Sequence, residues 1–292
     1  MFKKATKSQS KLRCAIFGVS GSGKTYTSLR IAKGLGGKIA LIDTERGSAS
    51  KYADRFDFDV VELLSPAVEN YVSFIEEANK LKYEVLIIDS LTHGWQELLE
   101  QIDRLAKSKF KGNTWSAWSE GTPIQKKLIN TLLSFNGHII ATMRSKTEWS
   151  IVDAGNGKSK PQRIGLTPEQ GKGIEYEFDI LMEISQDHIA EVIKDRTGKF
   201  QDKIIDKPSE KFGKELKEWL MDGSPMINKK EEELELKDMA LLTISSAIEI
   251  EQLNKIYNEC KKKITSQYYL DLIVDACKLK KIELLNNEDI PQ

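Results

Sequence analysis

Short apolar runs alternate with stretches of helical spacing from residue 11 to about residue 221. Each apolar run is continuous, which is typical of strands buried on both faces of a parallel sheet. The runs predict strands over 11–17, 38–43, 84–89, 138–143, 179–184 and 188–193, the last two as a hairpin around Gln186 and Asp187. Helical spacing predicts helices over 26–35, 70–81 and 122–135, the last with Pro123 near its start. We therefore expect an α/β fold, with a mostly parallel sheet flanked by helices.

The composition changes after Gly223-Ser224-Pro225, where this alternation ends. A charged run follows, and residues 241–285 then contain no proline or glycine but have leucine and isoleucine at helical spacing. The sequence does not indicate what this helical region does. The expected organisation is an N-terminal tail over 1–10, a core domain over 11–225, and a charged linker with a small region of two or three helices over 226–292.

The 292 residues include 44 basic and 44 acidic side chains, so the formal net charge is zero. This balance disfavours a protein that coats nucleic acid through its overall charge, and any such contact has to come from a local patch. The scattered Cys14, Cys260 and Cys277 are typical of buried thiols in a reducing cytosol, and the isolated histidines show no metal site. No apolar run reaches the about 18 residues of a membrane span, so we expect a cytoplasmic protein without membrane contact.

Residues 18–25 read Gly-Val-Ser-Gly-Ser-Gly-Lys-Thr and match the phosphate-loop pattern G-x-x-x-x-G-K-[ST]. A predicted strand precedes the loop and a predicted helix follows it, as the pattern requires. The glycines let backbone N–H groups surround phosphates, Lys24 adds a positive charge, and the Thr25 hydroxyl is a ligand for Mg²⁺. We expect ATP and Mg²⁺ as cofactors, with the nucleotide held by Gly18, Val19, Ser20, Gly21, Ser22, Gly23, Lys24 and Thr25.

Two carboxylates follow the ends of predicted strands. Asp89 ends the run 84–89, the position at which a carboxylate holds Mg²⁺ beside a phosphate loop. Glu45 comes just after the run 38–43, where a carboxylate can orient the attacking water and take its proton. On spacing alone Asp43 competes for this role, and a surface residue in a turn is the other interpretation of Glu45.

The phosphate loop, the D-x-E of Asp43 and Glu45, and the strand ending in IIDS at Asp89 resemble, in this order, the RecA/RadA family of recombinase ATPases. The resemblance covers about residues 11–206 and implies a RecA-like fold with Glu45 as the catalytic base. It also implies a γ-phosphate sensor in HIIATMR, for which Thr142 and Arg144 are the candidates, although bacterial recombinases usually have glutamine there. In EVIKDRTGKF it implies that Lys194 and Arg196 complete a neighbouring subunit's nucleotide site; a polar hairpin tip is the other interpretation.

The segment RSKTEWSIVDAGNGKSKPQRIGLTPEQGKGIEYEFDILMEI is most similar to compact RecA-like ATPases of bacteriophages, which act in single-strand annealing and recombination. Only about ten residues precede the first strand, so RecA's N-terminal helix has no counterpart. The resemblance therefore implies a ring or a short filament rather than a long one.

Two basic segments are candidates for contact with single-stranded DNA. Residues 144–173 are expected to form a long loop with six basic and three acidic residues, and in RecA-like proteins the loop after the sensor strand touches DNA. Residues 107–118 interleave basic and aromatic side chains, which suits phosphate contact and base stacking. Alternatively the lysines are ordinary surface residues, and Trp115 and Trp118 pack into the core. The candidate DNA-binding residues are Lys107, Lys109, Lys111, Lys146, Trp149, Lys158, Lys160 and Arg163.

The sequence thus predicts a RecA-like ATPase that acts on single-stranded DNA in phage-type recombination, annealing or replication, with hydrolysis stimulated by DNA. The expected partners are single-stranded DNA, further copies of the chain and a single-strand-binding protein, in the host cytosol if the protein is phage-encoded. The alternative is a nucleotide-gated loader or accessory protein with slow ATPase activity that recruits other replication proteins. A small-molecule kinase is disfavoured, because no lid arginine cluster or acceptor-binding segment is apparent.

Overall fold

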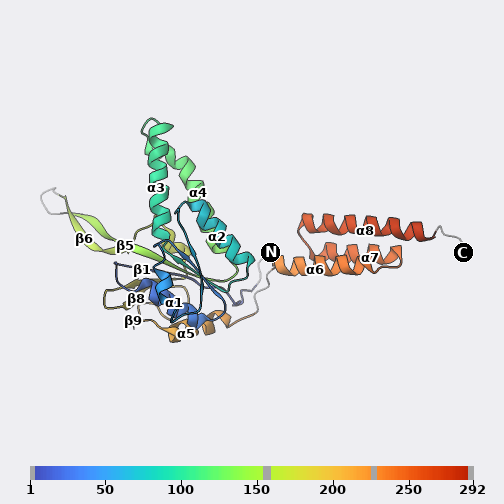
Figure 1. Cartoon of the computed structure of the whole chain (residues 1–292), viewed down its shortest axis with the longest axis horizontal. Coiled ribbons are helices and arrows are strands. Elements are labelled where there is room, and N and C mark those ends of the chain that lie inside the picture. Colours follow the sequence, from blue (N-terminus) through green and yellow to red (C-terminus); the bar gives the residue numbers. More distant parts are fainter. Residues whose placement is uncertain (1–3, 154–158, 225–228, 289–292) are drawn as a thin grey trace. The chain divides into compact units, whose positions relative to one another are not determined.

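The structure is a computed structural model that describes residues 4–153, 159–224 and 229–288. The chain divides into two compact units, Met1–Ser224 and Pro225–Gln292. Each unit has a hydrophobic core of its own, so each is a separate packing unit (Figure 1).

The first unit is built on a sheet with the strand order β3-β2-β4-β5-β1-β7-β8-β9. Neighbouring strands from β3 to β7 are parallel, while β8 and β9 join in antiparallel fashion. The predicted α/β fold with a mostly parallel sheet is confirmed. The strands are β1 (Arg13–Gly18), β2 (Ile39–Asp43), β3 (Asp59–Glu62), β4 (Val85–Asp89), β5 (His138–Asp153), β7 (Ile180–Ile184), β8 (Ile189–Asp195) and β9 (Ile204–Asp206).

The register of the parallel strands decides where the functional site forms. Gly18 at the end of β1 lies opposite Arg144 of β5, and Asp43 at the end of β2 lies opposite Asp89 of β4. Because these strands run in the same direction, the segments that follow them meet at one edge of the sheet. The phosphate loop and the two predicted carboxylates are therefore neighbours in space.

Helices cover both faces of the sheet, and each face has its own core. Side chains alternate between the faces along β4, so Leu86 and Ile88 pack in one cluster and Ile87 in the other. Figure 1 shows α2, α3 and α4 together on one side of the sheet, and α1 and α5 on the other. The helices are α1 (Lys24–Leu35), α2 (Val68–Lys80), α3 (Leu91–Ser108), α4 (Thr114–Ser134) and α5 (Glu210–Met221), with single turns η1 (Ala49–Tyr52) and η2 (Ile174–Glu177).

The start predicted for the helix over 122–135 is wrong. Helix α4 begins at Thr114, where the Asn113 side chain accepts a hydrogen bond from the N–H of Ser116, and Pro123 lies inside it. Proline removes the helical hydrogen bond to the carbonyl four residues earlier, and Ser119 at that position is exposed, so water can satisfy it. The asparagine cap, rather than the proline, marks where this helix begins.

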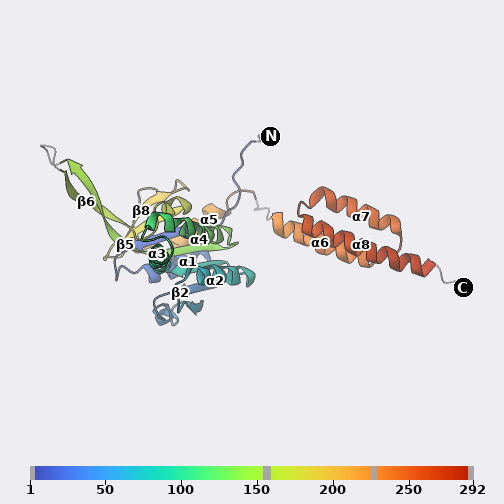
Figure 2. The ribbon, with the colours of Figure 1, turned by 90° about the horizontal axis from the view of Figure 1, so that it is seen from above.

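The long loop expected over 144–173 is also wrong. Strand β5 continues to Asp153 and pairs with β6 (Ser159–Pro168) in an antiparallel hairpin. In both views this hairpin extends beyond the rest of the first unit (Figures 1 and 2). The run Thr147–Val152 is rich in the β-branched and aromatic residues that favour strands, which explains why β5 continues through it.

The second unit is an arrangement of three helices in the part of it that the structure describes. They are α6 (Lys229–Ser245), α7 (Ile250–Lys263) and α8 (Gln267–Glu288), packed around a small core that includes Ile244, Leu253 and Ile273. The Glu233 carboxylate accepts hydrogen bonds from the backbone N–H groups of Thr265 and Ser266, just before α8 begins. Across residues 4–153, 159–224 and 229–288, no helix has both the length and the apolar character that crossing a membrane requires.

Candidate active site

The phosphate loop follows β1 and leads into the first turn of α1, at the wall of a cavity of about 920 Å³. Gly21 and Gly23 adopt the left-handed conformation, with φ of 78° and 86°, which glycine adopts without strain. A Cβ on Gly18 would lie 2.3 Å from the carbonyl oxygen of Ile184, so only glycine fits there. All the predicted loop residues line the cavity except Ser22, whose side chain is fully buried.

The Lys24 ammonium lies within the loop. Its Nζ donates hydrogen bonds to the carbonyl oxygens of Gly18 at 3.0 Å and Val19 at 2.9 Å. Burial lowers the pKa of Lys24, and the charges of Asp89 and Glu45 oppose that shift. A positive charge next to the exposed amides of a helix start is an arrangement that binds phosphate.

Asp89 lies buried at the end of β4, between two hydroxyl groups. Its Oδ2 accepts a hydrogen bond from Thr25 and its Oδ1 accepts one from Thr142, both at 2.5 Å. Burial raises the pKa of Asp89, and these two hydrogen bonds oppose the shift. Thr142 is fully buried behind Asp89 and is not part of the cavity wall, so it can act on a nucleotide only through Asp89.

Thr25 and Asp89 fit a Mg²⁺ ion that a nucleotide brings with it. Both present oxygen atoms, the ligand type that Mg²⁺ prefers, and they already lie within hydrogen-bonding distance of each other. Among the described residues there is no group of three or more His, Cys, Asp or Glu side chains that could hold a metal by itself. Phosphate oxygens and water would therefore supply the other ligands, as is usual for this ion.

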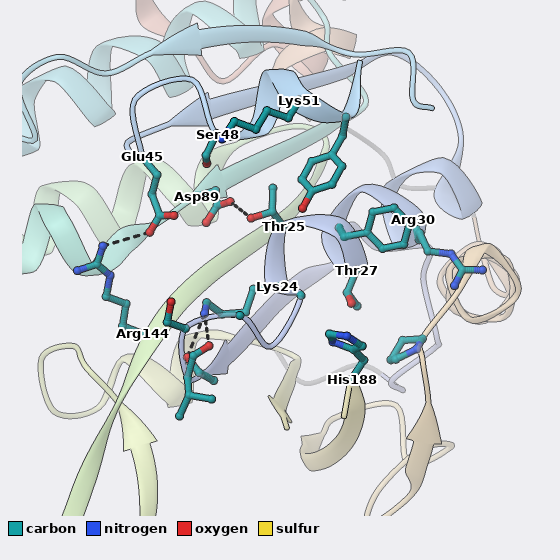
Figure 3. Close-up of a pocket in the computed structure, with 18 of the residues that line it drawn as sticks. Lys24, Thr25, Thr27, Arg30, Glu45, Ser48, Lys51, Asp89, Arg144 and His188 are labelled. Atoms are coloured by element: carbon teal, nitrogen blue, oxygen red, sulfur yellow. Dashed lines mark hydrogen bonds and ion pairs between the residues drawn. The ribbon is translucent and has the colours of Figure 1, made fainter. Parts of the chain in front are cut away.

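Glu45 and Asp43 have different surroundings. Glu45 lines the cavity, and its Oε1 lies 3.2 Å from Nη2 of Arg144. Asp43 is 1% exposed, and its two oxygens accept hydrogen bonds from the backbone N–H groups of Glu45 and Ala49. Asp43 thus shapes the turn that presents Glu45, and of the two carboxylates only Glu45 reaches the cavity (Figure 3).

A hydrogen-bond cluster around Thr44 joins the ends of β2 and β4. The Thr44 Oγ1 accepts a hydrogen bond from the N–H of Ser90 at 2.8 Å. The same oxygen lies 3.0 Å from the carbonyl oxygen of Asp89 and 2.6 Å from Nδ1 of His93. Burial lowers the pKa of His93, and the Arg144 charge adds to that effect. Glu45 directly follows Thr44, and Asp89 directly precedes Ser90. The hydrogen bonds of the cluster therefore fix the positions of the two backbone segments that carry these carboxylates.

The cavity continues past the phosphate loop to an aromatic wall that the sequence reasoning missed. Tyr26 follows Thr25 in α1 and Tyr52 ends η1; their ring centroids are 5.5 Å apart, and both rings line the cavity. Lys51 and Arg55 lie on the same wall. Aromatic rings in the same cavity as a phosphate site suit stacking of a nucleotide base. The signal was an aromatic residue directly after the loop and another shortly after D-x-E.

The opposite wall is formed by His188, Lys207 and Pro208. His188 appeared isolated in the sequence, yet it lies at the cavity (Figure 3), and its Nδ1 is 2.9 Å from the carbonyl oxygen of Ser22 in the phosphate loop. No local pattern marks this residue, because β7 has to pair with β1 before the turn after β7 reaches the loop.

A protein-family model described as an AAA domain matches residues 10–214. The chain belongs to the AAA domain family. It is therefore a P-loop ATPase domain of the AAA type, and the match spans the sheet, the phosphate loop and both carboxylates. No curated protein matches the chain.

Within this AAA domain, Lys194 and Arg196 lie far from the chain's own phosphate loop. Strand β8 runs antiparallel to β7, so these residues are near the amino end of β1, whereas the loop follows its carboxyl end. Lys194 donates to the carbonyl oxygen of Glu175, and Arg196 donates to that of Tyr176. Burial lowers the pKa of Lys194, and Arg196 adds to the effect. Neither residue lines the cavity, and their role in a neighbouring subunit stays a prediction.

Those candidate DNA-binding residues that the structure describes lie on two projections of the AAA domain. Lys107, Lys109 and Lys111 are at the end of α3 and in the turn before α4, where Lys109 pairs with Glu120. The two tryptophans differ: Trp118 stacks on Trp95, with ring centroids 5.7 Å apart, whereas Trp115 is 88% exposed.

The second projection is the β5–β6 hairpin. Lys146 is exposed on β5, Trp149 of β5 is opposite Arg163 of β6 in the backbone register, and Lys160 is on β6. Lys158 lies outside the described residues. DNA contact at either projection stays a prediction.

Proposed function

We propose that this AAA-type ATPase hydrolyses ATP with Glu45 as the base and uses the reaction on single-stranded DNA. The observation that carries the catalytic part is the meeting of Lys24, Glu45 and Asp89 at one cavity. Lys24 and the loop amides bind the phosphates, and the Thr25 and Asp89 oxygens hold Mg²⁺, which would offset phosphate charge. Glu45 orients the attacking water and accepts its proton.

Arg144 supports a link between the nucleotide and DNA. It lies where β5 leaves the central sheet, opposite Gly18, and the next residue, Ser145, already pairs with β6. It also lines the cavity and contacts Glu45. One continuous strand thus connects the phosphate loop with the projecting basic hairpin, and a γ-phosphate and Glu45 would compete for the Arg144 guanidinium. This arrangement favours Arg144 over Thr142 as the γ-phosphate sensor.

The assembly we propose is a ring or short filament in which Lys194 and Arg196 face the nucleotide of the next subunit. Their position away from their own phosphate loop supports this arrangement, since it leaves them free of the chain's own nucleotide site. A cation supplied in this way stabilises charge in the transition state. The proposed setting is phage-type recombination, annealing or replication, beside a single-strand-binding protein.

The test is phosphate release from ATP with and without single-stranded DNA, together with DNA affinity at two salt concentrations. We expect DNA to raise the rate. Three phosphate contacts would weaken binding roughly 20-fold over a fourfold rise in salt. Lys146→Glu and Lys160→Glu should reduce DNA affinity, whereas Lys214→Glu on α5 serves as a charge-matched control. An ATPase rate that DNA does not change, with no salt-dependent binding, would overturn the DNA part of the proposal.

The second candidate is a nucleotide-gated protein that recruits replication proteins. It is favoured by the separate helical unit, whose α8 exposes Tyr268, Leu279 and Ile282. For this function we expect slow hydrolysis that DNA leaves unchanged. The same ATPase measurement therefore separates the two candidates.

A further inference from the structure

His188 lies at the end of the turn between β7 and β8, and two backbone hydrogen bonds hold it in position. Its N–H donates to the carbonyl oxygen of Ser185 at 3.0 Å, and its own carbonyl oxygen accepts the N–H of Lys207 at 3.1 Å. Its φ is 65°, in the left-handed region that most residues other than glycine, asparagine, aspartate and histidine seldom adopt. The turn after β7 and the segment after β9 thus fix the backbone of His188 at the wall of the cavity.

The imidazole of His188 contacts the backbone of the phosphate loop. Its Nδ1 lies 2.9 Å from the carbonyl oxygen of Ser22, and a carbonyl only accepts, so Nδ1 carries the proton of this hydrogen bond. A Cβ on Gly23 would lie 3.0 Å from the same nitrogen. The ring therefore packs directly against the Ser22–Gly23 peptide, at a place that only glycine leaves open.

The contact restrains a phosphate-binding amide. The carbonyl of Ser22 and the N–H of Gly23 belong to one planar trans peptide and point in opposite directions. A hydrogen bond that holds the carbonyl toward His188 therefore directs the Gly23 N–H away from His188. That N–H belongs to the set of amides that the phosphate-loop pattern aims at the phosphates. Without the restraint, Gly23, whose φ is 86°, has wide conformational freedom on its side of this peptide.

We propose that His188 is a positioning residue for ATP hydrolysis: it fixes the Ser22–Gly23 peptide so that the Gly23 N–H faces the phosphates. The inference rests on the proposed binding of ATP in this cavity. Because His188 acts on phosphate binding and not on the attacking water, its loss raises the KM for ATP and the Kd for Mg–ADP, and leaves kcat nearly unchanged. One net hydrogen bond corresponds to about a tenfold loss of affinity.

The experiment compares His188→Ala with His188→Asn in the full chain, using Mg–ADP binding, ATPase kinetics and the melting temperature. Asparagine places an N–H donor on the same δ position and tolerates the left-handed conformation, so it should stay within about threefold of the unsubstituted protein. His188→Ala should bind Mg–ADP about tenfold more weakly. The matched control is Asp187→Ala, an exposed neighbour in the same turn, which should change neither KM nor Kd.

A Kd for Mg–ADP that is equal in His188→Ala and the unsubstituted protein overturns the inference, as does His188→Asn behaving like His188→Ala. A purely structural role would instead lower the melting temperature and kcat while KM stays constant, and that result also overturns it. If His188→Ala does not fold, His188→Gly removes the ring without strain at φ 65° and takes its place. An unsubstituted chain that binds no Mg–ADP overturns the ATP proposal and this inference together, whereas normal binding with no effect of His188 overturns only the inference.

Discussion

Replacing Glu45 by glutamine isolates the base from the rest of the site. Glutamine keeps the size of the side chain and one acceptor oxygen, but it cannot take a proton from water. The turn that presents residue 45 should persist, because Asp43 holds it through the backbone N–H groups of residues 45 and 49 and not through the Glu45 side chain. The change therefore removes proton transfer and the ion pair with Arg144, and little else.

The two losses differ enough in size to be told apart. The Glu45 and Arg144 side chains are 36% and 46% exposed, and ion pairs of this kind contribute about 0–1 kcal/mol, so their loss changes nucleotide affinity by at most about fivefold. A general base contributes at least about 100-fold to the rate, or roughly 2.7 kcal/mol of the activation free energy. We therefore expect Glu45→Gln to bind ATP almost normally and to hydrolyse it at least about 100-fold more slowly.

The assay is single-turnover phosphate release alongside equilibrium binding of Mg–ATP. Glu69→Gln, an exposed residue in the first turn of α2, is the matched control and should keep full activity. The reasoning is refuted if Glu45→Gln turns over normally while Asp43→Asn is the slow variant, since the base would then be Asp43. A 100-fold loss of ATP binding in Glu45→Gln would likewise refute it, because Glu45 would then act in nucleotide binding and not in proton transfer.

Three further predictions concern stability. Burial raises the pKa of Asp89 above its value in the unfolded chain, so the nucleotide-free protein loses stability as the pH rises through that raised pKa. Asp89→Asn should therefore raise the melting temperature at pH 7 in the presence of a chelator. The same substitution should abolish Mg²⁺-dependent ATPase activity. Arg13→Met should cost about 3 kcal/mol in denaturant unfolding, because the buried guanidinium donates to four carbonyl oxygens, and of these the Leu12 oxygen would keep the N–H of Ile139 as a donor while the others would lose the guanidinium. Glu233→Ala should cost about 1–2 kcal/mol in the unfolding of the helical unit, measured by hydrogen exchange across α8, because its carboxylate caps two backbone N–H groups there.

Local patterns were enough for the parts of the site that lie within one stretch of chain. The loop from Gly18 to Thr25 needs glycines at set places, a cation and a hydroxyl, and these follow each other directly in the sequence. Asp89 could also be predicted, since a buried run that ends in aspartate shows its strand and its end together. The parallel sheet followed from the continuous apolar runs for the same reason.

Only the tertiary structure decided which side chains reach the cavity from strands that are far apart in the sequence. Asp43 and Glu45 have similar spacing from β2, and only the fold shows that one turns inward to the backbone and the other reaches the cavity. His188 reaches the phosphate loop because β7 pairs with β1, a contact between residues far apart in the chain. The β5–β6 hairpin escaped prediction because its sequence beyond Met143 mixes polar and apolar residues and lacks the continuous apolar run from which the other strands were predicted. The sequence by itself thus determined the phosphate loop, whose residues are neighbours in the chain. The pairing of the strands determined which side chains from distant parts of the chain lie beside that loop.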